Sequence, residues 1–237
     1  MRESADVHGD IFPKRFAEDL VFASDSRGKL EERIFEVARQ LEKKFSKYPW
    51  FIGVAPFGSR VKGYSLPNEG SDIDVAVLYD SSISGMSSGA CWAFVQEECK
   101  SAEKDFDKNL VAVPYDLKLP KLETFLQRPL GKGIEAILFT GGLMHLCTTG
   151  FGPKVDEYAR AIGDAINKLP IRNRTMVVNR ITGDILIDEN KARVTEGKIR
   201  DRIRGMEKVS DEEFKGLVES RKSHWRKHVV EVLGIQE

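Results

Sequence analysis

The chain of 237 residues is poor in cysteine and lacks a long apolar run. Its three cysteines, Cys91, Cys99 and Cys147, have neither the spacing of a metal site nor the even number of a disulfide framework, so we expect free thiols in a reducing compartment. No apolar run approaches the roughly 20 residues that span a bilayer. No apolar segment follows the first residues, as one would in a secretory signal. The sequence therefore predicts a cytoplasmic protein without membrane contact.

An excess of charge of one sign is also missing. Lys and Arg together number 37, as do Asp and Glu, so the formal net charge is zero. This excludes a strongly basic coat or histone-like protein but leaves room for nucleic-acid binding through a local patch. Apolar residues make up 41% and charged residues 31%, which is typical of a globular protein rather than a disordered one. The chain is long enough to bury a core without disulfide or metal support.

Hydrophobic periodicity predicts a mixed first part of the chain. The expected elements are a helix at 29–45, strands at 50–57, 73–79 and 110–119, a helix at 91–106 and a short helix at 121–129. Pro56 and Pro114 fall inside two of these strands. Because proline cannot donate a ladder hydrogen bond, we expect the first near a strand end and the second at an edge or a bulge. The apolar, glycine-rich stretch at 131–151 fits no single element.

The second part of the chain is predicted to be mostly helical. Helices are expected at 155–168, 190–207 and 211–233, whereas 176–188 fits either a hairpin or a helix face. This order predicts an α+β fold, in which a mixed sheet with flanking helices is followed by a helical domain. We expect the domains to be 1–150 and 151–237, with a boundary somewhere within 120–155.

Two aspartates stand at the head of the second strand, in the sequence Asp72-Ile73-Asp74. Alternate side chains of a strand share a face, so both carboxylates should point the same way, with Cα atoms about 6–7 Å apart. Neighbouring carboxylates repel one another, and a divalent cation such as Mg²⁺, which prefers oxygen ligands, relieves that repulsion. Paired ions roughly 3.5–4 Å apart clamp the oxygens of a phosphoryl displacement. The pair therefore indicates a metal site for phosphate chemistry.

Gly58, Ser59 and Arg60 directly follow the first strand and indicate a phosphate-binding turn. Free backbone N–H groups at such a turn attract anions, glycine permits close approach, and the serine hydroxyl is a further donor. Arg60 and Lys62 add positive charge nearby. The turn is therefore suited to the β and γ groups of a triphosphate.

Neither half of this pattern is specific alone, because Asp105 and Asp107 form a second such pair, which we interpret as a solvated helix end. In this order, however, the pattern resembles the polymerase-beta-like nucleotidyltransferase superfamily. The resemblance rests on Gly-Ser, twelve further residues, and then Asp-Ile-Asp before an apolar strand. It implies a small mixed sheet with flanking helices in the catalytic core. It also implies that Gly58 and Ser59 bind the triphosphate, with Arg60 beside them.

The resemblance further implies that Asp72 and Asp74 bind two Mg²⁺ ions, with Mn²⁺ as a possible substitute. The family pattern requires a third carboxylate on a later strand, and Asp116 is the best match. In that role Asp116 would complete one metal site and favour the acceptor alkoxide. The alternative is a surface strand carboxylate paired with Lys118.

The implied reaction transfers a nucleoside monophosphate, AMP by default, from an NTP to an acceptor hydroxyl and releases pyrophosphate. The acceptor is left open among an RNA 3′ end, a small molecule, a protein hydroxyl and a second nucleotide. The competing hypothesis is a non-catalytic protein of the same fold, which binds a nucleotide or acts as an antitoxin-like partner.

Three features outside this pattern have two interpretations each. The cluster Lys198, Arg200, Arg202 and Arg204 fits either an RNA-binding face or a solvated helix, and we prefer the helix. Arg221 and His228 loosely resemble the Arg-x(4–6)-His signature of HEPN-type ribonucleases, although chance explains the spacing more simply. For His145 we expect a satisfied core or surface histidine rather than a ligand.

Overall fold

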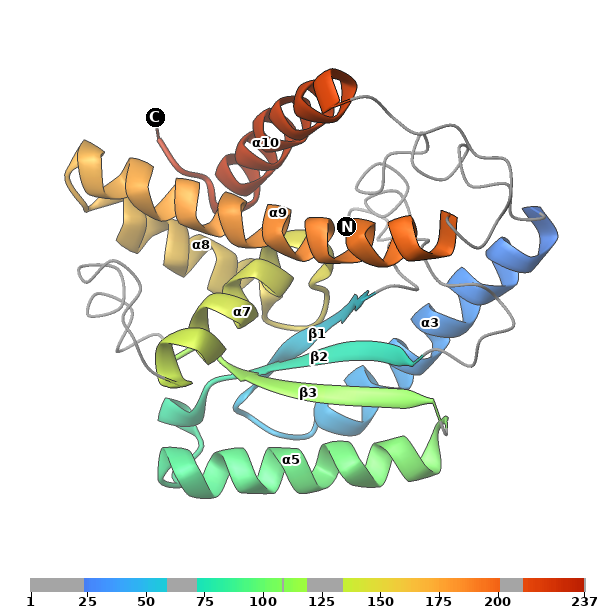
Figure 1. Cartoon of the computed structure of the whole chain (residues 1–237). Helices are drawn as coiled ribbons and strands as arrows, with labels where there is room; N and C mark the ends of the chain where they lie inside the picture. Colours follow the sequence, from blue (N-terminus) through green and yellow to red (C-terminus); the bar gives the residue numbers. More distant parts are fainter. Residues whose placement is uncertain (1–23, 59–71, 108, 119–133, 201–210, 237) are drawn as a thin grey trace.

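The computed structural model describes residues 24–58, 72–107, 109–118, 134–200 and 211–236 (Figure 1). The strands are β1 (Phe51–Phe57), β2 (Ile73–Tyr79) and β3 (Leu110–Asp116). The helices are α3 (Ser24–Phe45), the 3-10 helix η1 (Ser81–Ile83), α5 (Ser88–Asp105), α7 (Ile134–Thr149), α8 (Val155–Asn167), α9 (Ile171–Arg200) and α10 (Asp211–Leu233). The expected α+β class, with a helical C-terminal part, is confirmed.

The three strands form one sheet in the order β1-β2-β3. β1 and β2 are antiparallel, whereas β2 and β3 are parallel and are joined through α5. Both expected proline positions agree with this sheet. Pro56 is the second-last residue of β1 and Pro114 lies in β3, and these are the two edge strands, where a missing N–H donor is tolerated.

The side chains of β2 alternate between two separate cores. Ile73, Val75 and Val77 pack with α3 and α5 on one face of the sheet. Ala76 and Leu78 pack on the other face, against α7 and the C-terminal helices. Figure 1 shows α5 below the sheet and α7 and α9 above it. The sheet is therefore the middle layer between two helical layers.

The helices of the lower layer have the periodicity that the sequence predicts. In α3, Ile34, Val37, Leu41 and Phe45 recur at steps of three and four and are all buried. The expected helices at 29–45 and 91–106 are confirmed by α3 and α5. The expected third strand is confirmed too, although β3 ends at Asp116 rather than at residue 119. The short helix expected at 121–129 lies outside the described residues.

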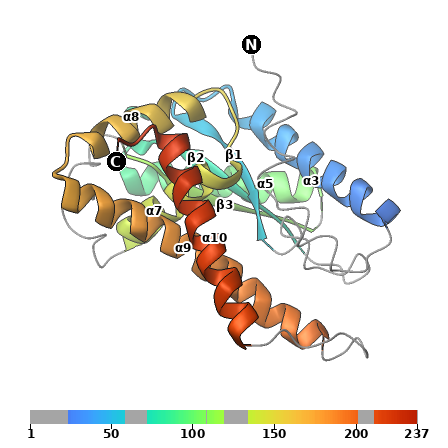
Figure 2. The ribbon, with the colours of Figure 1, turned by 90° about the horizontal axis from the view of Figure 1, so that it is seen from above.

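The upper layer resolves the two ambiguous stretches. The apolar run at 131–151 contains α7, which is apolar on all sides because it lies between the sheet and the other helices. The segment at 176–188 is part of α9, so its helical interpretation is correct. That helix begins at Ile171 and continues to Arg200, instead of starting near residue 190. Figure 2 shows α10 packed alongside α9.

The upper face of the sheet and the C-terminal helices share one hydrophobic cluster. It includes Ile52 and Leu78 from the strands, Ile162 from α8, Ile181 from α9 and Trp225 from α10. The division into domains at residue 150 stays a prediction, and this shared core shows how closely the two parts pack. Across the part of the chain that the structure covers, no helix combines the length and the apolar character needed to cross a membrane.

Candidate active site

The antiparallel pairing of β1 and β2 brings the end of one strand next to the start of the other. Phe57, the last residue of β1, is the Cα partner of Asp74. Gly58 follows directly, and Asp72 lies just before β2. Asp72 is exposed and Asp74 is partly buried. The structure therefore places Gly58, Asp72 and Asp74 at the same end of the sheet, as expected from the sequence.

Gly58 lies directly against the carboxylate of Asp74. A Cβ atom at residue 58 would be 2.0 Å from Asp74 Oδ2, which is far inside van der Waals contact. The φ angle of Gly58 is also +84°, a backbone conformation that disfavours other residues. The close contact at this glycine is thus with Asp74, while the approach of a phosphate that we expect here stays a prediction. Ser59 and Arg60 lie outside the described residues, so their roles in phosphate binding stay predictions.

Asp74 points to the upper face of the sheet. Alternation along β2 puts its side chain on the face of Ala76 and Leu78, which pack against α7. On β3, the Cα partner of Asp74 is Val111, and Val113 is the partner of Ala76. Both valines are partly exposed. The surface beside the carboxylate is therefore apolar on the β3 side.

Asp116 lies at the opposite end of the sheet, so the structure does not bring it together with Asp72 and Asp74, as the predicted shared metal site requires. Its Cα partner on β2 is Tyr79, the last residue of that strand, and it lies five residues beyond Val111 on β3. At about 3.3 Å per residue, the separation along the strand is about 16 Å. Its side chain also faces the lower layer, since alternation places it with Leu110 and Ala112.

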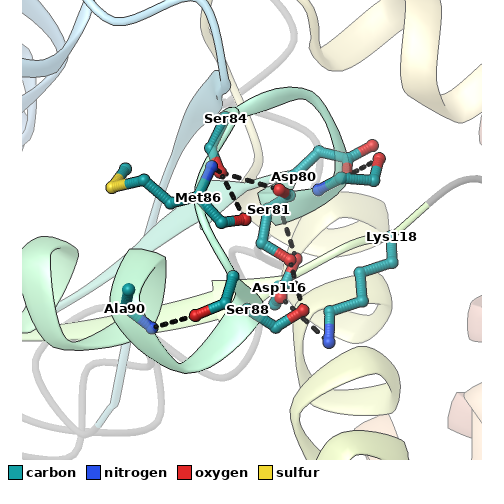
Figure 3. A network of polar contacts seen from close by, with 10 residues as sticks. Asp80, Ser81, Ser84, Met86, Ser88, Ala90, Asp116 and Lys118 are labelled. Carbon is teal, nitrogen blue, oxygen red and sulfur yellow. Dashed lines mark hydrogen bonds and ion pairs between the residues drawn. The ribbon is translucent and has the colours of Figure 1, made fainter.

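A buried polar network surrounds Asp116 (Figure 3). The backbone N–H of Ser81 donates to Asp116 Oδ1 at 3.0 Å, and Lys118 Nζ lies 3.4 Å from Oδ2. Asp80 accepts from the Ser82 N–H at 2.8 Å and from the Tyr158 hydroxyl at 2.9 Å. These contacts join the ends of β2 and β3 to α8.

Burial raises the pKa of the Asp116 carboxyl, while the Ser81 hydrogen bonds and the Lys118 ammonium group oppose that rise. The side chain is only 7% exposed. The pairing with Lys118 that we considered as the alternative is therefore present, but it is buried rather than on the surface. These partners satisfy the Asp116 carboxylate within the fold, and its role as a metal ligand stays a prediction.

The carboxylates of Asp72 and Asp74 are the candidate donors to a metal ion at the other end. Carboxylate oxygens are the ligands that hard divalent cations prefer, so this donor set fits such an ion in chemical type. Within the described ranges, no group of three or more His, Cys, Asp or Glu side chains is arranged to bind a metal. A complete protein-only coordination shell is thus not formed by these residues.

The other residues that the sequence singled out, Asp105, Asp107 and His228, are either exposed or bound to neighbouring helices. Asp105 ends α5 and is exposed, as expected, whereas Asp107 binds Arg33 of α3 at 3.1 Å. His228 Nε2 lies 2.8 Å from the carbonyl oxygen of Cys147, and burial lowers the pKa of this histidine. His228 therefore joins α10 to α7.

The side chains of Arg221 and of the basic cluster at 198–204 lie outside the described part of the structure, so both interpretations of these residues stay open.

Sequence reasoning missed the contribution of α7 to this site. His145 is buried, and its ring centroid lies 4.3 Å from that of Phe57 and 4.9 Å from that of Tyr115. One turn later, Thr149 Oγ1 donates to the carbonyl oxygen of Pro56 at 2.5 Å. The only sequence signal was the four-residue spacing of two polar side chains in an apolar stretch, which does not reveal their partners.

Comparison with known proteins agrees with the position of this site. The family model described as a nucleotidyltransferase domain matches residues 36–138, which include Gly58, Asp72 and Asp74. Residues 36–138 therefore match a nucleotidyltransferase domain, which confirms the predicted resemblance to the polymerase-beta-like superfamily. No curated protein and no solved structure matches the chain.

Proposed function

We propose that this protein transfers a nucleoside monophosphate from an NTP to an acceptor hydroxyl and releases pyrophosphate. The observation that supports it most is the contact between Gly58 and the Asp74 carboxylate inside the matched domain. A glycine turn for phosphate and a carboxylate for a cation are what a metal-bound triphosphate requires, and here they touch.

In this proposal each group of the chain has a separate task. The backbone of Gly58, with Ser59 and Arg60, holds the β and γ phosphates. Asp72 and Asp74 hold divalent cations, two Mg²⁺ ions or Mn²⁺ in their place, with water and phosphate oxygens as further ligands. When bound, these ions neutralise the charge of the triphosphate.

The reaction forms one bond and breaks one. The acceptor oxygen attacks the α-phosphorus, and the bond from that phosphorus to the oxygen bridging to the β-phosphate breaks, so that pyrophosphate leaves. The acceptor hydroxyl loses its proton to solvent water. The chain contributes mainly by holding the triphosphate and the acceptor in line and by placing charge where it develops. ATP is the default donor.

A second function, nucleotide binding without transfer, is supported by one specific observation. On β3, the positions beside Asp74 and Ala76 are Val111 and Val113, whereas the family pattern requires a third carboxylate on a later strand. A site that has only Asp72 and Asp74 could hold a metal-bound nucleotide and still lack the group that favours the acceptor alkoxide. A partner protein or nucleotide sensor would have such a site.

Transfer of an α-phosphate label separates the two functions. The protein is incubated with each α-labelled NTP, Mg²⁺ and, in turn, an RNA oligonucleotide, aminoglycosides, casein and a second nucleotide. Label on an acceptor, with matching pyrophosphate release that Asp74→Asn abolishes, supports transfer. Binding of an NTP without pyrophosphate release from any mixture supports the non-catalytic function. Absence of both binding and release contradicts both proposals.

A further inference from the structure

The outer edge of β1 is covered by the connection between α7 and α8. The N–H and carbonyl groups of Val54 exchange two hydrogen bonds of 2.9 Å with Phe151. Further along, the N–H of Lys154 donates to the carbonyl oxygen of Ile52 at 3.1 Å. The connection therefore runs beside β1 like a short fourth strand and protects an otherwise open edge.

Thr149 extends this edge contact to the last residues of β1. In an antiparallel strand alternate residues direct their backbone groups to the same side, so Pro56 faces outward as Val54 does. Proline has no N–H, which leaves only its carbonyl to be satisfied there. The Thr149 hydroxyl does this at 2.5 Å, and both residues are buried.

His145 supports the same strand end from the same helix. Residues four apart share a face of a helix, so His145 and Thr149 both face the sheet. The ring of His145 lies against Phe57, the residue between Pro56 and Gly58. One face of α7 therefore contacts the two residues that lead directly into the turn at Gly58.

Small displacements of this strand end would reach the carboxylate pair. Pro56 is the partner of Val75 and Phe57 is the partner of Asp74 in the β1–β2 ladder. The Gly58 backbone then lies so close to Asp74 that no Cβ would fit between them. Because these residues are in contact, a shift of Pro56 changes how the turn and the carboxylate face each other.

We propose that Thr149 is a positioning residue, which holds the carbonyl of Pro56 and thereby the turn at Gly58 against Asp74. The proposal rests on the proposed function, since it assumes that this turn binds the triphosphate. In this proposal, α7 connects the C-terminal helices α8, α9 and α10 to the turn that binds the nucleotide.

A neighbouring threonine provides a matched control. Among the described residues, Thr148 Oγ1 bonds only within its own helix, to the carbonyl oxygens of Met144 at 3.1 Å and His145 at 3.3 Å. Thr149→Val and Thr148→Val each replace a hydroxyl by a methyl of similar size. Thr149→Ser keeps the hydroxyl and should behave as the wild type. Thr149→Ala replaces Thr149→Val if the valine variant does not fold.

The first readout is amide hydrogen exchange at Phe57 and Gly58, which needs no activity. We expect Thr149→Val to raise both exchange rates about tenfold and Thr148→Val to leave them unchanged, because only the first leaves the Pro56 carbonyl without its donor. Equal exchange in the two variants overturns the proposal.

The second readout is the dissociation constant of each NTP with Mg²⁺. We expect Thr149→Val to raise it about tenfold for the preferred NTP, since misplaced binding groups lose affinity steeply, and Thr149→Ser to restore it. Faster exchange with unchanged NTP affinity overturns a role at the nucleotide site. If the wild type binds no NTP, the proposed function fails, and the exchange rates still decide whether Thr149 fixes the turn.

Discussion

Each end of the sheet carries a pair of aspartates, and the two pairs are in opposite environments. Asp80 and Asp116, where β2 and β3 end, are 1% and 7% exposed and are bonded by the chain itself. At the start of β2, Asp72 is exposed and Asp74 is partly buried. In the proposed function, burial rather than the presence of carboxylates separates the pair that supports the fold from the pair that binds a ligand.

The largest effect is expected from Asp74→Asn. Removing this charge should lower nucleotidyl transfer by about a thousandfold or more, because the amide holds a divalent cation poorly. The fold should persist, since repulsion with Asp72 is relieved at the same time. The measurement is label transfer together with circular dichroism. Turnover equal to that of the wild type would show that Asp74 has no such role.

At the other end, Lys118→Met should act on stability instead of on nucleotide binding. It removes the ammonium group 3.4 Å from the buried Asp116 carboxylate, and an uncompensated buried charge costs about 3–5 kcal/mol. Urea unfolding measures the loss, and the folded fraction should bind Mg²⁺–NTP as the wild type does. If binding is weakened as well, the two ends are not independent.

Gly58→Ala should weaken nucleotide binding, and Gly85→Ala is its control. Both glycines have positive φ, +84° and +74°, so alanine costs each about 1–2 kcal/mol of backbone strain. A Cβ added at residue 58 would clash with Asp74. Among the described residues, by contrast, no atom lies within 4 Å of a Cβ at residue 85. We expect more thermal destabilisation in Gly58→Ala than in Gly85→Ala, because the clash adds to the strain, and an affinity loss of about tenfold or more confined to Gly58→Ala. Equal affinities would contradict the contact.

The smallest effect is a pH dependence at the buried end. Burial raises the pKa of Asp116, so the folded protein holds this proton more tightly than the unfolded chain. The resulting stabilisation is complete below the usual aspartate pKa of about 3.9 and is lost as the pH rises through the raised value in the folded protein. The free energy of unfolding of the wild type, minus that of Asp116→Asn, should therefore decrease over this window. A constant difference in urea titrations would contradict it.

Elements with clear periodicity could be predicted from the sequence, and α7 could not. α3 has a helical stripe and β3 alternates between buried and partly buried residues, whereas β1 and β2 are short apolar runs because both of their faces are covered. α7 is surrounded by apolar neighbours and has no stripe. Its Gly141 and Gly142 suggest a break, yet they let the helix approach β3, where a Cβ at Gly141 would lie 2.5 Å from the Tyr115 ring.

The proximity of Gly58 and Asp74 could be predicted from the sequence, whereas the position of Asp116 could not. Gly58 and Asp74 lie on adjacent antiparallel strands that follow each other in the chain, so the motif order implies their proximity. Asp116 is the last residue of β3, which is parallel to β2, and a helical connection such as α5 does not set the register as a tight hairpin turn does. A matching residue pattern could therefore not show that Asp116 lies at the other end.

Thermal unfolding with Mg²⁺ and each of the four NTPs tests the central claim most directly. It is run on the wild type, on Asp72→Asn/Asp74→Asn and on Asp116→Asn, each against its own ligand-free baseline. A ligand at 100 times its dissociation constant stabilises a protein by about 2.7 kcal/mol, which is a clear shift. We predict a Mg²⁺-dependent shift with at least one NTP in the wild type and in Asp116→Asn, and none in the double variant. A shift that persists in the double variant, or is absent from the wild type, would contradict nucleotide binding at the Gly58–Asp74 end of the sheet.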